Sequence, residues 1–296
     1  MSEVRITFLG TSASAPTKER GLPAVFLEYR GHGLLFDVGE GTQRQFMRFG
    51  RSIMKVEHVF VSHYHGDHVF GLPGLLSTMA LYGRKKPVHV WVPARQVAYV
   101  EQLINAIPTG VDFPVLFHAV DEGILLHTQE FSILAYPLDH TTDCFAYVFE
   151  EAPKVKADKA KVRALGLEGP LVRELKAGNT IVWKGRTIRP EDIVYTVPGR
   201  KVVYAADTRP VHHEYAENAD VLIHDSTFLS ADADLAVEKK HSTAAEAAEL
   251  AKELSAKRLV LFHFSARIKD LSAPEDEART IFENSCAAYD GCTLEL

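Results

Sequence analysis

The feature that most constrains this chain is the stretch His63–His68, whose sequence is His-Tyr-His-Gly-Asp-His. It places four potential metal ligands within six positions. The apolar run at 59–61 precedes it and predicts a buried strand. Residues 70–82 predict a helix that starts after the Pro-Gly pair at 73–74. We therefore expect the ligands on a loop between a strand and a helix, where a rigid scaffold holds reactive groups open to a substrate.

The spacing within this loop suits two metal ions better than one. His63 and His65 lie two positions apart, so on an extended segment they point the same way and can hold one ion. Asp67 and His68 turn off in another direction, and Gly66 gives the backbone the freedom for that turn. Two ions can use all four groups if other segments supply further ligands. The alternative, a loop of solvated surface histidines, is disfavoured by four ligands directly behind a buried strand.

The same loop resembles the signature loop of the metallo-β-lactamase superfamily. The resemblance implies a four-layer αββα sandwich, with helices outside, two sheets inside and a two-metal site at one edge. His65 occupies the position at which the di-iron oxidoreductases of that fold carry Glu, so the resemblance points to the zinc hydrolases.

Further carboxylates and histidines follow predicted strands along the chain. They are Asp37 after 33–36, His140 after 131–136, Asp207 after 202–206, Asp225 after 221–223 and His263 after 258–262. Strands that alternate with helices predict an α/β architecture, and side chains at successive strand ends converge on one edge of a sheet. Asp37 either orients a ligating histidine through its free ring nitrogen or caps the helix that follows.

These residues complete a ligand set for two ions. We expect His63, His65, His140 and Asp207 to hold one ion, and Asp67, His68, His263 and the other oxygen of Asp207 to hold the second. Two such ions can activate water and stabilise an in-line displacement at phosphorus, with Asp67 placed to accept the water proton. Histidine and carboxylate ligands favour zinc, and manganese or iron suits the same site. A closed structural site would be richer in cysteine.

Charge is segregated along the chain. Residues 153–189 contain ten Lys/Arg and three Asp/Glu, a charge of +7, which leaves −13 on the remainder of a chain whose net charge is −6. We expect one domain over 1–296 with this segment as a basic insertion. On charge alone, the insertion is either a solvated helical protrusion or a phosphate-binding arm.

Composition places the chain among ordinary globular proteins. Its 296 residues are 46% hydrophobic, and they contain no apolar run approaching the ~20 residues that a membrane span needs. The start lacks a signal-peptide pattern, and three cysteines without a Cys-x-x-Cys pair fit a reducing compartment. We therefore expect a cytoplasmic protein without a membrane partner.

Several motifs together resemble the short form of the ribonuclease Z (tRNA 3′-processing endonuclease) family. They are residues 36–44, the metal loop with residues 70–76, His224–Phe228, His241–Thr243 and three stretches of the insertion, at 166–170, 176–178 and 185–192. The resemblance covers nearly the whole chain. It implies a zinc-dependent endoribonuclease that removes the 3′ trailer of precursor tRNA and leaves a 3′-hydroxyl on the tRNA and a 5′-phosphate on the trailer.

The resemblance also implies roles for individual segments. The basic insertion becomes an exosite arm that clamps the tRNA elbow, and a homodimer lets one subunit's arm hold tRNA for the other's active site. His241 becomes the general acid, oriented by Asp225, with Asp67 as the third catalytic group. The implied substrate-binding residues are Lys18, Arg20, Gly169, Pro170, Arg173, Lys176, Ser242 and Thr243. Ser242 or Thr243 would also cap the helix that follows.

Two positions depart from the family pattern. Asp225 stands where the family usually has Glu, and it is one methylene shorter. Gly21 ends a loop in which the family pattern has Asn, and that loop is linked to the 3′ end of the acceptor stem. Two other functions stay open: a small-molecule phosphodiesterase or lactonase of the same superfamily, and a non-catalytic RNA-binding subunit.

Overall fold

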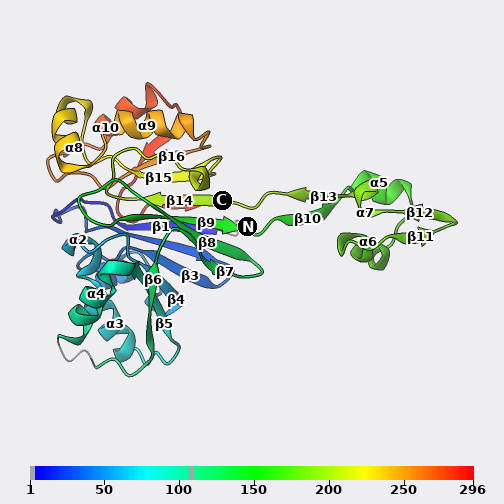
Figure 1. The fold of residues 1–296 in the computed structure, drawn as a ribbon, viewed down its shortest axis with the longest axis horizontal. Helices are drawn as coiled ribbons and strands as arrows, with labels where there is room; N and C mark the ends of the chain where they lie inside the picture. The colour runs from blue at the N-terminus through cyan, green and yellow to red at the C-terminus, as the bar shows by residue number, and fades with distance from the viewer. Residues whose placement is uncertain (1–3, 107–109) are drawn as a thin grey trace.

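A computed structural model describes residues 4–106 and 110–296, and two seven-stranded sheets form its body (Figure 1). In spatial order, the first sheet comprises β18 (Thr293–Glu295), β1 (Val4–Gly10), β2 (Ala24–Tyr29), β3 (His32–Phe36), β4 (Val56–Phe60), β5 (Val88–Pro93) and β6 (Val115–Val120). The second comprises β17 (Ser285–Ala287), β16 (Leu259–Phe262), β15 (Val221–Asp225), β14 (Lys201–Ala205), β9 (Phe145–Glu151), β8 (Phe131–Pro137) and β7 (Gly123–His127).

Helices cover the outer face of each sheet (Figure 1). The first sheet carries α1 (Thr42–Arg48), α2 (Gly66–Val69), α3 (Leu72–Leu81) and α4 (Val97–Asn105). The second carries α8 (Ala233–Lys239), α9 (Ala244–Glu253) and α10 (Ser272–Arg279). This is the predicted four-layer αββα sandwich, and the fold prediction is confirmed.

Three apolar clusters explain why the layers stack. Aromatic residues such as Phe36, Phe60 and Tyr204 fill the space between the sheets. Leucine-rich α3 packs on the outside of the first sheet, and small alanines on α9 let it lie close to the second. Burying both faces of a sheet is what favours near-continuous apolar strands over alternating ones.

Strand directions set where the site is built. β3, β4, β5 and β6 are parallel neighbours, as are β14, β15, β16 and β17. Their carboxyl ends therefore lie at one edge of the sandwich, where the Phe145 amide donates to the Ser62 carbonyl across the two sheets (3.0 Å). The loops that follow these strands meet at this edge.

The metal-loop helices differ from the prediction. α3 begins at Leu72, before the Pro-Gly pair, because proline is well suited to a first helical turn where its missing N–H is not needed. The expected loop residues Asp67 and His68 lie on the short helix α2. Gly66 has no positive φ; a Cβ there would come within 2.3 Å of the Phe70 ring, so any larger residue would require that exposed side chain to move.

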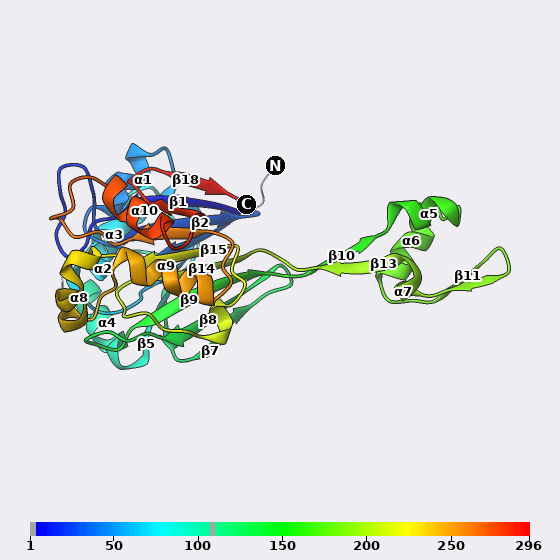
Figure 2. The ribbon, with the colours of Figure 1, turned by 90° about the horizontal axis from the view of Figure 1, so that it is seen from above.

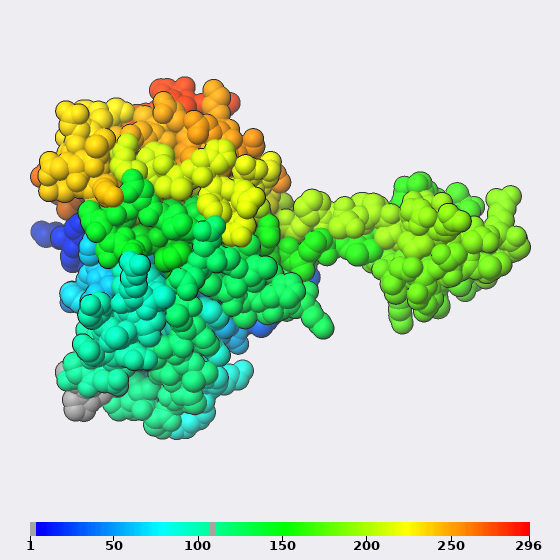
Figure 3. Space-filling view, viewed as in Figure 1, coloured from blue at the N-terminus to red at the C-terminus, as the bar shows by residue number. Residues whose placement is uncertain are grey.

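The basic insertion is an arm that projects from the end of the sandwich opposite the metal loop (Figures 2 and 3). Its stalk pairs β10 (Lys154–Ala157) with β13 (Val194–Val197). Beyond the stalk lie α5 (Lys159–Ala164), α6 (Gly169–Lys176), the hairpin β11 (Ile181–Trp183) and β12 (Arg186–Ile188), and α7 (Pro190–Ile193). The arm thus extends past the expected limit near 189, because the returning strand β13 is needed to pair the stalk.

The tip of the arm has its own small apolar core. Leu167, Leu175, Ile188 and Ile193 are buried together, separate from the clusters of the body. Within residues 4–106 and 110–296, no helix has the length and apolar character that crossing a membrane requires.

Candidate active site

The predicted histidines of the first ligand group lie together. His63 Nε2 lies 2.8 Å from His65 Nδ1, and His140 Nε2 lies 3.3 Å from the same His65 nitrogen. Both His63 and His140 are buried, and burial lowers the pKa of His63 well below the usual value. Neutral imidazoles with ring nitrogens facing one another are the form that binds a divalent metal.

Asp207 lies between two groups of histidines and presents one oxygen to each. Its Oδ2 is 3.7 Å from both His63 Nε2 and His140 Nε2. Its Oδ1 is 3.2 Å from His68 Nε2 and 3.0 Å from His263 Nε2. Asp67 joins the second group, with Oδ2 3.5 Å from His68 Nε2 and 3.7 Å from His263 Nε2. A single carboxylate is therefore in position to bridge two cations.

Three atoms at the centre of the second group have unmet hydrogen-bonding capacity. His68 Nε2, His263 Nε2 and Asp207 Oδ1 are buried and have no hydrogen-bond partner among the described residues. Buried polar atoms without partners are costly, and several that converge on one point indicate a missing ligand. Although burial opposes it, the charges of Asp207, Asp37 and Asp67 raise the pKa of His68 well above its usual value, so this point attracts positive charge. The residues present fit divalent metal ions.

Asp37 anchors the back of the metal loop. Its Oδ2 lies 2.7 Å from His68 Nδ1, and it accepts hydrogen bonds from the Tyr204 hydroxyl (2.7 Å), the Ser62 hydroxyl (2.8 Å) and the Ser62 amide (2.7 Å). It does not cap α1, whose N-cap is Gly41 and lacks a side-chain cap. The sequence did not predict roles for Ser62 and Tyr204. Its only indication is that both residues lie near the ends of predicted strands.

Several site residues hold strained backbone conformations. Asp37, Asp207 and His263 each follow a strand and have φ of +54°, +25° and +63°. Left-handed conformations are uncommon for residues other than glycine and concentrate at functional sites. All three side chains contact other members of the site: Asp37 lies against His68, and Asp207 lies against His68 and His263.

Asp225 and His241 form a pair beside the metal groups. Asp225 Oδ2 lies 2.7 Å from His241 Nδ1, so the shorter carboxylate makes this contact directly. Burial alone would lower the pKa of His241, but the negative charge of Asp225 and this hydrogen bond raise it above its usual value. The His241 ring lies 5.4 Å from that of His263 and 5.2 Å from that of His140, between centroids. An imidazole with a raised pKa is thus held next to the ligand groups.

Three further residues tie this arrangement together. The Thr227 hydroxyl lies 2.9 Å from His263 Nδ1 and donates to Asp225 Oδ1 (2.7 Å). Arg209 donates to the His241 carbonyl (2.6 Å) and to Glu246 (2.9 Å). The Ser14 amide donates to Asp67 Oδ2 (2.8 Å). Thr227 lies in a motif noted from the sequence, whereas Arg209 and Ser14 carried no signal there.

The predicted substrate-binding residues fall into two groups. Lys18 is exposed on the loop before β2, and Gly169, Pro170, Arg173 and Lys176 are exposed on α6 of the arm. The other three residues are buried and serve the scaffold. Arg20 donates to the carbonyls of Ile268 (2.9 Å) and Ser265 (3.0 Å), the Ser242 hydroxyl donates to the Thr208 carbonyl (2.6 Å), and Thr243 is the N-cap of α9.

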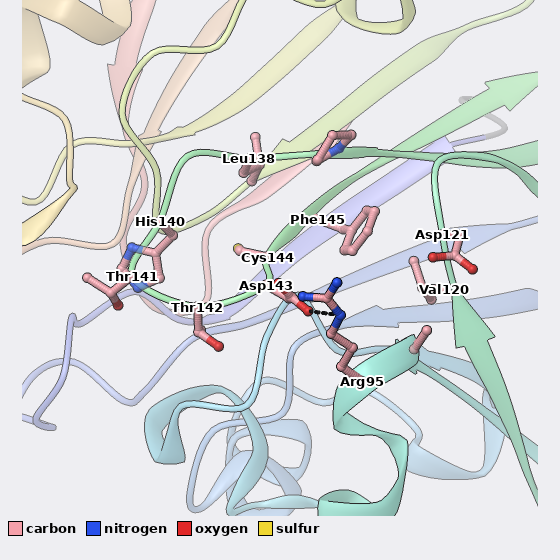
Figure 4. A pocket seen from close by; sticks show the side chains of 12 residues that line it. Arg95, Val120, Asp121, Leu138, His140, Thr141, Thr142, Asp143, Cys144 and Phe145 are labelled. Carbon is pink, nitrogen blue, oxygen red and sulfur yellow. Dashed lines mark ion pairs between the residues drawn. The ribbon is translucent and has the colours of Figure 1, made fainter.

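Two cavities border the metal groups. One of about 480 Å³ is lined by Asp67, His241, Phe228 and Arg267. The other, of about 490 Å³, lies on the far side of the loop 138–144 (Figure 4). His140 and Thr141 line both, so the two cavities meet at the ligand groups.

The fold and the site together define a metal-dependent hydrolase of the metallo-β-lactamase superfamily. The family described as "Beta-lactamase superfamily domain" matches residues 180–264, and "Anti-Pycsar protein Apyc1" matches residues 4–109. In the solved structure of human tRNase Z, short form, the fold covers 98% of both chains with a TM-score of 0.71 and 27% sequence identity.

Curated relatives narrow the class to one family. Ribonuclease Z of Natronomonas pharaonis is 42% identical over 99% of this chain and 98% of its own length. Ribonuclease Z of Myxococcus xanthus is 38% identical over 100% of this chain and 99% of its own. The chain belongs to the ribonuclease Z family, and the resemblance drawn from its motifs is confirmed.

Proposed function

We propose that this chain is the endoribonuclease that removes the 3′ trailer from precursor tRNA. The product tRNA ends in a 3′-hydroxyl, and the trailer begins with a 5′-phosphate. The observation that carries the proposal is the division of the two Asp207 oxygens between two groups of histidines, beside the pair formed by Asp225 and His241. Family membership supplies the substrate class.

We propose two zinc ions per subunit. His63, His65 and His140 would hold one, Asp67, His68 and His263 the other, and Asp207 would bridge them. Zinc in these positions lowers the pKa of a bound water and neutralises charge that develops on the phosphoryl oxygens. Manganese or iron suits the same donors, so metal analysis of the purified protein decides the identity.

Residues of the chain supply the proton transfers. Asp67, held by the Ser14 amide, accepts a proton from the attacking water. His241, fixed through Nδ1 by Asp225, donates its Nε2 proton to the 3′-oxygen that leaves with the tRNA. Each positioned acid or base contributes about 10²- to 10⁴-fold in rate. The raised pKa of His241 favours the protonated form that this role requires.

We propose that the arm binds tRNA and that, in a homodimer, it holds the tRNA for the active site of the partner subunit. Its stalk continues from the end of β9, whereas β9 begins next to Ser62 at the metal-loop edge. The arm therefore leaves the sandwich at the end opposite its own site (Figure 2). Exposed bases on α6 suit contacts with phosphates. Three free cysteines fit the cytoplasm as its compartment.

The direct test is incubation of the purified protein, with zinc or manganese, with precursor tRNA carrying a labelled 3′ trailer. A single metal-dependent cut at the end of the acceptor stem, absent in Asp67→Ala, is the expected result. Hydrolysis of bis(p-nitrophenyl) phosphate without a tRNA cut would instead indicate a small-molecule phosphodiesterase.

A mixing experiment tests the dimer. One subunit carries Asp67→Ala with an intact arm, and the other carries an intact site without residues 154–197. Each is expected to be weak alone, and the mixture to recover cleavage if the arm acts in trans. No recovery, in a mixture shown to exchange subunits, would contradict this arrangement.

A further inference from the structure

The loop 138–144 divides the surface at the metal groups into two cavities. The first contains His241 and Arg267, and the second contains Arg95, Thr142 and Asp143 (Figure 4). An endonuclease must accommodate RNA on both sides of the bond that it breaks. The first cavity can accommodate the RNA on only one side of that bond.

The position of His241 assigns a side to each cavity. In the proposed reaction, the bond between phosphorus and the tRNA 3′-oxygen breaks while a bond from water oxygen to phosphorus forms. The water loses a proton to Asp67, and His241 gives its proton to the 3′-oxygen. The terminal nucleoside of the tRNA must therefore lie on the His241 side, in the first cavity.

The trailer remains attached to phosphorus through its 5′-oxygen. In an in-line displacement, this oxygen is one of the equatorial substituents, so the trailer leaves the phosphorus sideways from the line that joins water and the 3′-oxygen. The second cavity adjoins the first across the rim formed by His140 and Thr141, so it is open to a strand that turns away from the His241 side.

We propose that this second cavity binds the first nucleotides of the RNA trailer, an inference that rests on the proposed endoribonuclease function. Its volume of about 490 Å³ is large enough for a nucleotide. Leu138, Phe145 and Val120 supply apolar walls for a base, and Thr142 and Asp121 supply hydrogen-bonding groups for its edge. Such a mixture of apolar walls and few polar groups is typical of ligand sites.

Arg95 is the group suited to a trailer phosphate. Its side chain is 86% exposed, and Nε lies 3.7 Å from Asp143 Oδ2, a long and solvated ion pair that costs little to exchange for a phosphate. The rim opposite is held in place by Gln96, whose Nε2 donates to the Thr142 hydroxyl (3.1 Å) and to the Asp143 carbonyl (2.8 Å). The cavity is thus formed before RNA binds.

Trailer length provides the test. A trailer of one nucleotide carries only the scissile phosphate, whereas longer trailers add phosphates that can reach Arg95. We expect Arg95→Gln to raise KM about five- to tenfold for a trailer of six nucleotides. The same variant should change KM for a one-nucleotide trailer, and Kd for mature tRNA, much less.

Two further variants sharpen the result. Asp143→Asn frees Arg95 from its ion pair and should lower KM for the six-nucleotide trailer, the opposite sign. Arg267→Gln, on the His241 side, should affect mature tRNA and all precursors alike. Lys85→Gln removes an exposed base paired with Asp112 away from both cavities and serves as the neutral control.

The outcomes separate this inference from the function on which it rests. Wild-type protein that cuts no precursor of any trailer length would overturn the proposed function. Wild-type protein that cuts normally, with an Arg95→Gln effect that is absent or equal for all trailer lengths, would overturn the trailer site and leave the function intact.

Discussion

The two ends of the sandwich are built by different means. The end that carries the metal loop is stabilised by buried polar contacts. The single carboxylate of Asp37, for example, accepts hydrogen bonds from Ser62 and Tyr204 and lies within hydrogen-bonding distance of His68. The arm at the other end is a two-stranded stalk with a small apolar core and an exposed, basic surface.

The two ends are therefore suited to different tasks: one can place catalytic groups precisely, and the other can contact a large substrate far from the site. Catalysis requires ligands and proton donors held to within a fraction of an ångström, which buried networks and strained strand ends provide. Binding a large polyanion requires charge at a distance and tolerates flexible side chains. Substitutions at the two ends should therefore change different kinetic quantities.

The largest effect is expected at the metal-loop end. Asp67→Ala removes a metal ligand and the proton acceptor, so kcat for precursor tRNA should fall about 10⁴-fold or more, while Kd for tRNA changes little. Single-turnover cleavage and tRNA binding measure the two quantities. Asp276→Ala, exposed on α10, is the matched control. Near-normal cleavage by Asp67→Ala would contradict the proposal that this end of the sandwich carries the catalytic groups.

Removing the arm should have the next largest effect. Excision of residues 154–197, closed by a short Gly-Ser turn, should lower kcat/KM for precursor tRNA about 10²-fold or more through KM, because many phosphate contacts are lost. The cut spares the hydrogen bond from the Glu151 amide to the Arg200 carbonyl (2.8 Å) at the root of the stalk.

Hydrolysis of bis(p-nitrophenyl) phosphate is the control for folding of the armless protein, and it should persist. If tRNA cleavage survives arm removal at high salt as well as low salt, the arm is not the tRNA-binding element. An excision that stops at 189 would leave β13 without its partner strand and would confuse the result.

Asp225→Asn should give a smaller loss. The neutral amide no longer favours protonated His241, so kcat should fall about 10²-fold. His241 acts in its protonated form, and activity is lost as pH rises through its pKa. Since Asp225 raises this pKa, the substitution should move the alkaline limb of the kcat profile to lower pH. Asp225→Glu should retain most activity; an unchanged pH profile in Asp225→Asn would show that Asp225 does not orient the acid.

The smallest effect is expected on β4 and β5 of the first sheet, where the half-buried His58 packs against His89, with 4.8 Å between ring centroids. Burial, followed by the charges of His89, His118 and His32, lowers the pKa of His58 to about 4 from 6.5. The unfolded chain therefore binds the extra proton between these values. Stability should be greatest above pH 6.5 and should fall as pH decreases toward 4, by up to about 3 kcal/mol.

Urea unfolding at several pH values measures this loss. His58→Gln removes the titrating group and keeps an acceptor for the Trp91 indole N–H, which now donates to His58 Nδ1 (3.1 Å). The variant should show a flatter dependence between pH 4 and 6.5 and normal cleavage at neutral pH. An equally steep dependence would mean that another group controls the loss of stability in acid.

Much of the site could be foreseen because its residues occur at strand ends, and a strand end can be recognised from local sequence. The ligand and acid roles of Asp67, Asp207 and His241 stay predictions until metal and activity are measured, but their side chains do meet at one edge. The fold and the family were predicted correctly for the same reason: several local motifs pointed to one architecture.

The sequence alone supplied the candidate donor residues and the charge of the arm, which depend on residue type, and the αββα class, which followed from the resemblance of local motifs to a known family. The folded chain was needed to show which oxygen of Asp207 faces which histidines, that Ser62, Tyr204 and Thr227 support the ligands, and that Arg20 and Ser242 are buried. These contacts join segments from distant parts of the chain. Such contacts depend on sheet order and on strained strand ends, and no local pattern records either.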